Sequence, residues 1–314
     1  MSAKILISSI GGLLAQNVSK CIRDEFPDSL IFGTDIAFEN AGKLFCDEMF
    51  IVPKANSEEF LINLKLIVAK FNPDFYFPLN ESEIDVLTRT PQNELNRIFG
   101  KCKIIWASEE ARRFFLDKEL TMEFLKKLGI DIPEIFDAKS ISNARFPLVV
   151  KPSNSSGSKG IFVCNNHDEV NAACVFVNKP VIQEYIGSPD EEFTAGVYSH
   201  DGQNVSVIAF RRRLSPGGGT SWCETILDQE ITDICNRVAR AIRLIGSINL
   251  QMRKQNNKYL VFEINPRFSS TAHIRHLIGF KDVIWSLTGV APQWQITATS
   301  KSTFAVIQQA TKLA

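Results

Sequence analysis

The first hundred residues alternate short apolar runs with helical patterns. The apolar runs are residues 5–8, 30–35 and 75–78, and apolar positions at helical spacing cover about 13–25 and 58–71. Strands that alternate with helices in this way predict a parallel sheet with crossover helices. Residues 103–106 read as a further strand, and Ser108 is then placed to cap a charged helix that begins at Glu109. We therefore expect a first α/β domain that ends near residue 107.

Beyond that boundary the pattern changes to short strands joined in hairpins. Apolar runs at 148–152, 160–164, 180–186, 193–198 and 205–210 are separated by turn residues, and Asp201-Gly202 is a hairpin turn pair. A helix with an apolar stripe runs from Ile231 to Ile245, and Gly246 ends it. This part of the chain is therefore expected to be α+β, with the helix lying on a sheet.

Charge and composition exclude several classes of partner. Lys plus Arg equals Asp plus Glu at 35 each, so no global field attracts nucleic acid or anionic lipid. No stretch approaches the roughly 18 apolar residues of a membrane span, and the first residues lack the pattern of a leader peptide. Seven scattered cysteines without a CxxC pair fit a reducing compartment. We expect a cytoplasmic protein that binds neither nucleic acid nor membrane, and a homodimer is left open.

Polar and apolar residues alternate along residues 247–253 and 259–267, and the polar turn between these two segments predicts a β-hairpin. On the second strand Glu263 and Asn265 share a face. A turn centred near Asn256 places Asn249 opposite Glu263 and Gln251 diagonal to it. Carboxylate and amide oxygens are ligands of Mg²⁺, so Gln251, Glu263 and Asn265 form a candidate nucleotide-metal site. The alternative interpretation is an exposed polar face of a sheet.

A loop rich in small residues follows Lys151, which ends an apolar strand. Backbone N–H groups in such a loop can approach phosphate closely. The order Gly157-Ser-Lys-Gly160 leads into a strand and not into a helix, so it is not a Walker A motif. A solvated hairpin tip is the alternative. Arg267, just beyond the polar strands, is placed to neutralise phosphate.

Several motifs in a fixed order resemble the ATP-grasp superfamily, and most closely the synthetase halves of the carbamoyl phosphate synthetase large subunit and related carboxylate–amine ligases. These motifs are Asp117-Lys118, Val149-Val-Lys-Pro152, Ser156-Gly-Ser-Lys-Gly160, Ile182-Gln-Glu-Tyr-Ile186, Glu191-Glu-Phe-Thr194, Gln251 and Phe262-Glu-Ile-Asn-Pro-Arg267. The resemblance implies a Rossmann-like pre-ATP-grasp domain over residues 1–107. It also implies an ATP-grasp fold with a central subdomain over 108–182 and a C-terminal subdomain over 183–314.

The resemblance implies a role for each matching residue. Lys118 and Lys151 contact ATP phosphates, and the loop from Ser153 to Gly160, including Gly157 and Ser158, closes over them. The hinge residues that read adenine are Gln183, Glu184, Tyr185 and Ile186, with Glu184 taking the amino group. Glu192 binds ribose, although Glu191 competes for that role through a one-residue shift. The Mg²⁺ ligands are Gln251, Glu263 and Asn265, and the catalytic residues nearest the transferred phosphate are Arg267 and Lys151.

Three other groups of residues are weaker candidates. Arg211 and Arg213 share a strand face and are candidates to clamp a substrate carboxylate while Arg212 is solvated; an exposed basic edge strand is the alternative. Gly11 follows the first strand and opens a helix, where backbone donors can hold a polar substrate. His273 and His276 have helical spacing and are expected to lie on a helix.

The implied activity is that of an ATP-dependent ligase. Such an enzyme activates a small carboxylate as an acyl phosphate for attack by an amine or ammonia, and it releases ADP and phosphate. The expected cofactors are ATP and Mg²⁺, with Mn²⁺ as an alternative ion, and the expected partners are small carboxylate and amine substrates. An ATP-dependent kinase, a carbamoyl-phosphate-like synthesis and a non-catalytic ATP-binding regulatory module are the alternatives.

Overall fold

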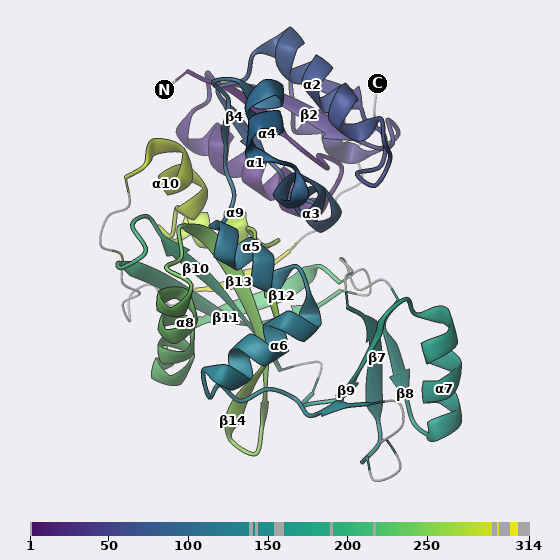
Figure 1. Ribbon diagram of the computed structural model, residues 1–314. Coiled ribbons are helices and arrows are strands. Elements are labelled where there is room, and N and C mark those ends of the chain that lie inside the picture. The colour runs from purple at the N-terminus through teal and green to yellow at the C-terminus, as the bar shows by residue number, and fades with distance from the viewer. Residues whose placement is uncertain are drawn as a thin grey trace.

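The computed structural model describes residues 2–137, 141, 144–153, 160–188, 191–215, 218–290, 294 and 302–306. These residues form three sheets, one parallel and two antiparallel (Figure 1). The predicted fold class, an α/β part followed by an α+β part, is confirmed.

The N-terminal part is a five-stranded parallel sheet in the order β3-β2-β1-β4-β5. Its strands are β1 (Lys4–Ile7), β2 (Leu30–Asp35), β3 (Glu48–Ile51), β4 (Phe75–Phe77) and β5 (Lys103–Ile104), and its helices are α1 (Leu13–Glu25), η1 (Ala41–Leu44), α2 (Phe60–Phe71), α3 (Glu81–Arg89) and α4 (Gln92–Phe99). Separate apolar clusters cover its two faces, one with α1 and one with α2 and α4. This burial on both faces explains why β1 is a continuous apolar run.

A smaller antiparallel sheet has the strand order β6-β9-β7-β8. It consists of β6 (Ile135–Phe136), β7 (Leu148–Pro152), β8 (Phe162–Cys164) and β9 (Pro180–Glu184), and α7 (His167–Phe176) covers one of its faces. Figure 1 shows this sheet and α7 to one side of the rest of the chain. Val150 of β7 and Ile182 of β9 lie in the core beneath α7. Lys151 and Gln183 directly follow these residues in the chain, so they lie on the opposite face of the small sheet.

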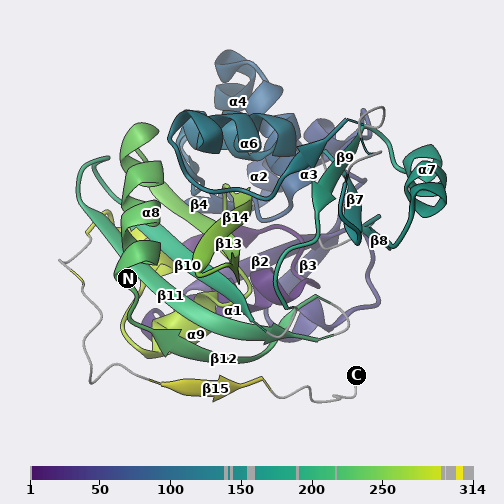
Figure 2. The ribbon, with the colours of Figure 1, turned by 90° about the horizontal axis from the view of Figure 1, so that it is seen from below.

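The largest sheet has six antiparallel strands in the order β14-β13-β10-β11-β12-β15. They are β10 (Glu192–Ser199), β11 (Val205–Leu214), β12 (Thr220–Ile226), β13 (Gly246–Gln255), β14 (Lys258–Asn265) and β15 (Thr303–Ala305). The remaining helices are α5 (Glu109–Phe115), α6 (Lys118–Lys127), α8 (Gln229–Ala241), α9 (Ala272–Leu277) and α10 (Asp282–Thr288). Figure 2 shows β15 at the edge of the sheet, beside β12.

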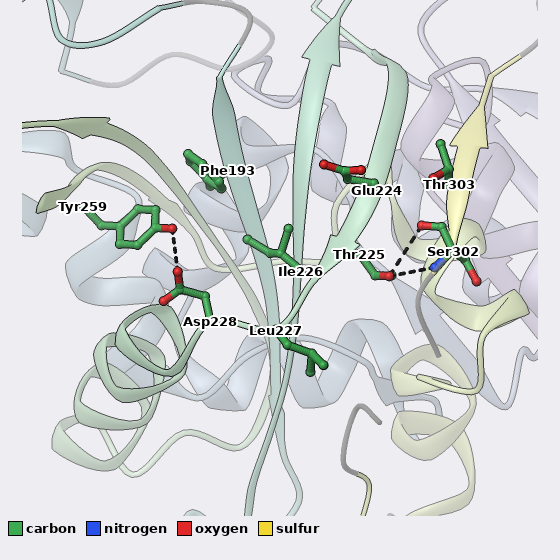
Figure 3. A pocket seen from close by; sticks show the side chains of 9 residues that line it. All are labelled: Phe193, Glu224, Thr225, Ile226, Leu227, Asp228, Tyr259, Ser302 and Thr303. Atoms are coloured by element: carbon green, nitrogen blue, oxygen red, sulfur yellow. Dashed lines mark hydrogen bonds between the residues drawn. The ribbon is translucent and has the colours of Figure 1, made fainter. Parts of the chain in front are cut away.

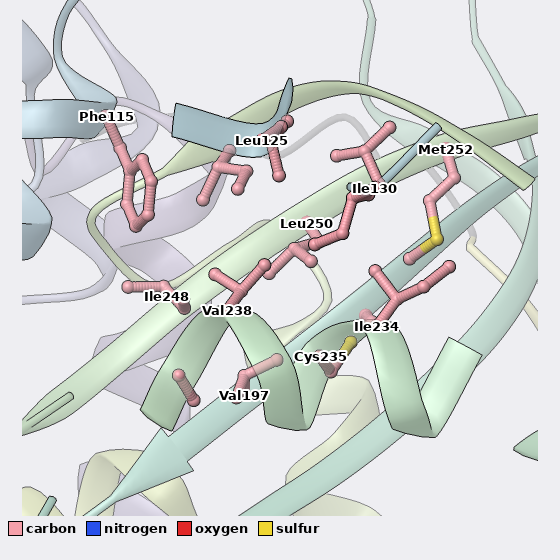
Figure 4. Packing of buried hydrophobic residues seen from close by; sticks show 14 of the residues in the cluster. Phe115, Leu125, Ile130, Val197, Ile234, Cys235, Val238, Ile248, Leu250 and Met252 are labelled. Atoms are coloured by element: carbon pink, nitrogen blue, oxygen red, sulfur yellow. The ribbon is translucent and has the colours of Figure 1, made fainter. Parts of the chain in front are cut away.

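Helices α5, α6 and α8 pack on one face of this sheet around a single apolar core (Figure 4). The predicted stripe of α8 is buried there, with Val238 and Cys235 fully covered against Leu250 of β13. Each such side chain contributes about 1.5–3 kcal/mol to the stability of the fold by burial. A one-residue shift in strand register would expose these side chains, so their burial also fixes which residues lie on the opposite face of the sheet. Helices α5 and α6 precede the small sheet in the chain but belong to this core.

Two local expectations were wrong. Ser108 occupies the N-cap position of α5, but its side chain makes no capping hydrogen bond and its hydroxyl oxygen is buried. The strand expected at 103–106 spans only Lys103–Ile104, because the chain then turns towards α5. Of the helices described, none combines the length and the apolar character that crossing a bilayer requires.

Candidate active site

The candidate metal ligands lie on the face of the six-stranded sheet opposite α5, α6 and α8, part of which is covered by α9, α10 and a second apolar cluster. Gln251 of β13 lies directly opposite Glu263 of β14, and Asn249 lies opposite Asn265. Opposed residues on one face of a sheet have Cβ atoms about 5 Å apart, so these side chains share a small volume. Asn265 is buried and Glu263 keeps 24% of its side chain exposed. The structure therefore brings Gln251, Glu263 and Asn265 together.

A β-bulge sets this register, and the register expected from the sequence was wrong. Asn249 was expected opposite Glu263, but the two strands turn at Asn256 and Asn257, both of which have positive φ. The pairing then shifts between Gln251 and Met252, and Phe262 is the extra residue on β14. The longer turn and the bulge together move Glu263 two residues along β13.

The bulge also ties the small sheet to β14. The Lys151 amino group donates a hydrogen bond of 3.2 Å to the carbonyl oxygen of Phe262. The Lys118 amino group lies 3.8 Å from Glu263 Oε1. Two lysines from different elements thus contact neighbouring residues of β14, Phe262 and Glu263, and both lysines are buried.

The first turn of α6 positions Lys118. Asp117 caps this helix, since its Oδ1 accepts from the backbone N–H groups of Glu119 and Leu120. The same oxygen accepts from the Ser153 hydroxyl at 3.1 Å, and the Lys118 N–H donates to the Ser153 carbonyl. The start of α6 is therefore fastened to the end of β7, which carries Lys151.

Burial lowers the pKa of Lys151 to about 8. Desolvation is the main cause, because it disfavours the charged ammonium. Glu263 opposes this effect, while the neighbouring charges of Lys118 and Arg253 add to it. The site thus holds more positive than negative charge, which favours a polyanion.

Glu192 is buried at the start of β10 and is held by two arginines. Arg212, its partner across the strand pair, donates two hydrogen bonds to Oε1 at 2.6 and 3.1 Å. Arg253 of β13 donates to Oε2 at 3.1 Å. Both carboxylate oxygens are therefore engaged by the protein, whereas neighbouring Glu191 is exposed.

The expected roles of the three consecutive arginines are reversed. Arg212 was expected to be solvated, but it is 4% exposed and faces the site with Glu192. Arg211 pairs across the strands with Phe193, which is in the helix-covered core, so Arg211 and Arg213 lie on the other face of the sheet. Arg211 forms an ion pair with Glu224 at 2.6 Å. The alternation of β11 therefore places Arg212, and not Arg211 or Arg213, on the sheet face that carries Glu192 and Gln251.

The expected hinge joins the small sheet to β10. The Gln183 amide lies 4.0 Å from the Met122 sulfur. The Glu184 carboxylate accepts a 2.6 Å hydrogen bond from Gln255, and Arg253 donates to the Ile186 carbonyl oxygen at 3.3 Å. The Tyr185 ring lies 5.5 Å from the Arg253 guanidinium. The hinge is thus held by side chains at the end of β13 and by backbone hydrogen bonds to the small sheet, where the Glu184 N–H donates to the Glu134 carbonyl oxygen at 2.8 Å.

Arg267 links the six-stranded sheet to the N-terminal domain. Its guanidinium donates to Glu81 of α3 at 2.5 and 3.0 Å. Gly11, the substrate candidate of the first domain, donates its N–H to the Asp35 carboxylate at 2.9 Å. A Cβ at Gly11 would lie 2.5 Å from the Asn40 side chain. The Gly11 N–H is therefore already used within the protein and covered by Asn40.

A model of the ATP-grasp domain matches residues 115–271, which is half of the chain. The chain belongs to the ATP-grasp family. The family resemblance inferred from the motifs is thereby confirmed, and the matched ATP-grasp segment runs from α5 to the start of α9, so it contains both lysines, the hinge and the hairpin of β13 and β14.

Similar proteins include two kinds of ligase. A D-alanine–D-alanine ligase from Fusobacterium nucleatum is 35% identical over 112 residues, which cover 35% of this chain and 37% of the ligase. The carbamoyl phosphate synthase large chain of Methanothermobacter thermautotrophicus is 23% identical over 279 residues, which cover 81% of this chain but 26% of the synthase. The chain thus spans about a third or less of these relatives.

Solved structures of low identity share the ATP-grasp fold. The biotin carboxylase domain of a 2-oxoglutarate carboxylase from Hydrogenobacter thermophilus, solved with MgADP and bicarbonate, has a TM-score of 0.72 at 13% identity and covers 96% of this chain and 72% of that chain. N5-carboxyaminoimidazole synthetase from Staphylococcus aureus has a TM-score of 0.66 at 18% identity and covers 93% and 78% of the two chains. These likenesses support the fold.

The candidate ATP-grasp metal ligands are one carboxylate and two amides. Within the described ranges, no group of three or more His, Cys, Asp or Glu side chains could hold a metal ion. An ion that keeps water and phosphate oxygens among its ligands needs only one or two carboxylates, which is the pattern of Mg²⁺ with a nucleotide. Gln251, Glu263 and Asn265 fit such an ion. Gly157 and Ser158 lie outside the described residues, and Gly160 has a φ of +73°.

A pocket on the opposite face of the sheet does not belong to this site. Phe193, Ile226 and Tyr259 line it together with residues from the β12–α8 connection and from residues 302 and 303 (Figure 3). Its carboxylates have partners, since Asp228 accepts from the Tyr259 hydroxyl and Glu224 binds Arg211. The pocket lies on the helix-covered side, away from Glu263.

Sequence reasoning missed Glu81, Arg212, Arg253 and Gln255. Two of them have a signal that strand alternation provides, since Arg253 and Gln255 follow Gln251 at intervals of two. Arg212 is identified only by its pairing with Glu192 in the structure. The contact of Glu81 was missed because its segment, residues 80–83, was expected to cap a helix in preference to lining the cleft near Gly11. Its contact with Arg267 joins residues 186 positions apart, so no local pattern indicates it.

Proposed function

We propose that this protein is an ATP-grasp ligase that joins a small carboxylate to an amine or ammonia, with release of ADP and phosphate. The supporting observation is that Lys118 lies 3.8 Å from the Glu263 carboxylate and Lys151 binds the carbonyl oxygen of neighbouring Phe262, beside the sheet face that carries Gln251, Glu263 and Asn265. This arrangement supplies cations for a polyphosphate and oxygens for its metal ion. Phosphoryl transfer depends on such positioning and charge neutralisation more than on a protein nucleophile.

In the proposed first step a carboxylate oxygen of the substrate attacks the γ-phosphorus, the bond to the bridging oxygen breaks, and ADP leaves. Lys118 of α6 and Lys151 of the small sheet balance the charge on the phosphate oxygens. Mg²⁺, held by Gln251, Glu263 and Asn265, supplies further charge neutralisation when it is bound. Arg267 is assigned to the transferred phosphate, and Glu81 orients its guanidinium in the absence of substrate.

In the second step the amine nitrogen attacks the acyl carbon, phosphate leaves with the bonding electron pair, and the amine gives up a proton. The acyl phosphate must be kept from water during this step. The uncovered face of the small sheet and the loop from Ser153 to Gly160 are assigned to cover it. The domain division at 107 and 182, the adenine-reading hinge 183–186 and a ribose-binding Glu192 remain part of this proposal.

Release of ADP and phosphate from ATP, measured across a panel of carboxylates and amines, tests the proposal. We expect release that requires one carboxylate and one amine together. Glu263→Gln should abolish it, and Glu230→Gln, an exposed change on α8, should leave it unchanged. ADP release that needs a carboxylate but no amine would support a kinase instead. Binding of MgATP without release for any pair would support a regulatory module.

A further inference from the structure

The hinge lies directly on the end of β13. Gly187 has a φ of +56°, and a Cβ at this position would lie 3.0 Å from the Lys254 carbonyl oxygen and 3.2 Å from the Arg253 Cβ. A side chain would therefore push the hinge away from the strand. The close approach of these backbones means that β13, which carries the candidate metal ligand Gln251, also sets the position of the hinge.

Gln255 binds the hinge at two points. Its amide nitrogen donates a 2.6 Å hydrogen bond to Glu184 Oε1, and its amide oxygen accepts a 3.3 Å hydrogen bond from the Gly187 N–H. Because one end of the amide donates and the other accepts, only one orientation of this side chain satisfies both contacts. Gln255 thus holds one oxygen of the Glu184 carboxylate relative to the hinge backbone, and the Glu134 N–H donates a longer hydrogen bond of 3.4 Å to the other oxygen.

Arg253 holds the same hinge differently. It donates to the Ile186 carbonyl oxygen at 3.3 Å and to Glu192 Oε2 at 3.1 Å. Neither hydrogen bond involves Glu184. The two side chains therefore hold the hinge at different points: Arg253 binds the Ile186 carbonyl oxygen and the acid Glu192, whereas Gln255 binds the Gly187 N–H and, of the two, is the one that contacts the Glu184 carboxylate.

We propose that Gln255 is a positioning residue that selects the nucleotide base. By holding Glu184 at a fixed place on the hinge, it presents a hydrogen-bond acceptor to a base whose exocyclic group donates, as the amino group of adenine does. This inference rests on the proposed function, because it assumes that the nucleotide lies along the hinge. Gln255 acts through Glu184 and the Gly187 N–H and does not touch the reacting atoms.

The test compares the affinity for ATP with that for purine riboside triphosphate, which lacks the amino group. The wild-type protein should bind ATP about tenfold more tightly, since a hydrogen bond to a charged acceptor is worth at least that factor. Gln255→Met should remove most of this preference and leave the affinity for the purine analogue within about twofold. Arg253→Met should weaken both nucleotides equally, and Lys254→Met, on the other face of β13, should change neither.

The outcomes separate this inference from the proposed function. Equal losses for both nucleotides in Gln255→Met, or an unchanged preference, would overturn the positioning role while nucleotide binding stands. If the wild-type protein binds neither nucleotide, the proposed function fails and takes the inference with it. Should Gln255→Met fail to fold, Gln255→Glu keeps an acceptor for the Gly187 N–H but opposes the charge of Glu184, and it should show the same selective loss.

Discussion

Replacing Glu83 by Gln should remove a pH dependence from the stability of the N-terminal domain. Glu83 lies in α3, is 4% exposed, and accepts a hydrogen bond from the Tyr76 hydroxyl. Burial raises the pKa of this carboxyl group from 4.5 to about 8, although a hydrogen bond with Ser8 partly opposes the change. The carboxyl group is therefore protonated in the folded protein at neutral pH, and a glutamine has nearly the same shape and the same neutral charge.

The sign and size follow from proton linkage. Between pH 4.5 and 8 the folded protein keeps a proton that the unfolded chain releases, so the free energy of unfolding falls as pH rises. Each pH unit within this range changes it by about 1.4 kcal/mol. The contribution of Glu83 should therefore fall by about 2 to 3 kcal/mol between pH 5.5 and 7.5. The total loss across the whole range is about 5 kcal/mol.

Urea denaturation of both proteins, measured at several pH values from 5.5 to 7.5, provides the assay. Glu83→Gln should gain stability relative to the wild-type protein as pH rises, with an unchanged dependence on urea concentration. Glu94→Gln, an exposed change on α4, should follow the wild-type curve. A constant difference between Glu83→Gln and the wild-type protein over this range would refute a buried, protonated Glu83.

Three further predictions concern the site and its support. In the wild-type protein, the affinity for a non-hydrolysable ATP analogue should fall about tenfold between pH 7 and pH 9, because Lys151 loses its proton near pH 8. Lys151→Met should abolish this fall in affinity, and a fall retained in the variant would contradict the prediction. Arg267→Gln should lower kcat at least about 100-fold and change the dissociation constant of ATP less than threefold; an equal loss in both would assign Arg267 to ground-state binding. Gly196→Ala should destabilise the protein by about 2 to 4 kcal/mol in thermal or urea unfolding. The new Cβ would lie 2.5 Å from the fully buried Arg275 guanidinium, which Asp282 holds in place. Unchanged stability would show that the ion pair of Arg275 and Asp282 can move aside.

The parts of the fold that depend on periodicity were accessible from the sequence. The apolar run of β1, the stripe of α8 and the alternation of β13 each reflect one buried face, and a buried face repeats at every second or every third to fourth residue. The same reasoning grouped Gln251, Glu263 and Asn265 correctly on one sheet face. Periodicity therefore sufficed for the elements and for showing that these three candidate metal ligands share a face, whereas metal binding itself stays a prediction.

What periodicity could not provide was the pairing between distant elements. Whether Arg212, or instead Arg211 and Arg213, lies on the face of the candidate site depends on the register between β10 and β11. This register pairs Arg212 with Glu192. The contact between Arg267 and Glu81 depends on how the N-terminal domain packs on the large sheet. Such contacts are set by tertiary packing, so nothing in the neighbouring sequence reports them.

The bulge at Phe262 makes the number of residues in β14 matter as much as their identity. Val261 and Ile264 are both in the core beneath α6 and α8, three positions apart, because the strand changes parity between them. Deleting one residue here would restore regular pairing between β13 and β14. Glu263 and Asn265 could then stay on the face of the candidate site only if Tyr259 and Val261 left the core face. A frame-preserving deletion of a single codon at this place would therefore exchange the sheet face that carries the candidate metal ligands with the face that lies in the core.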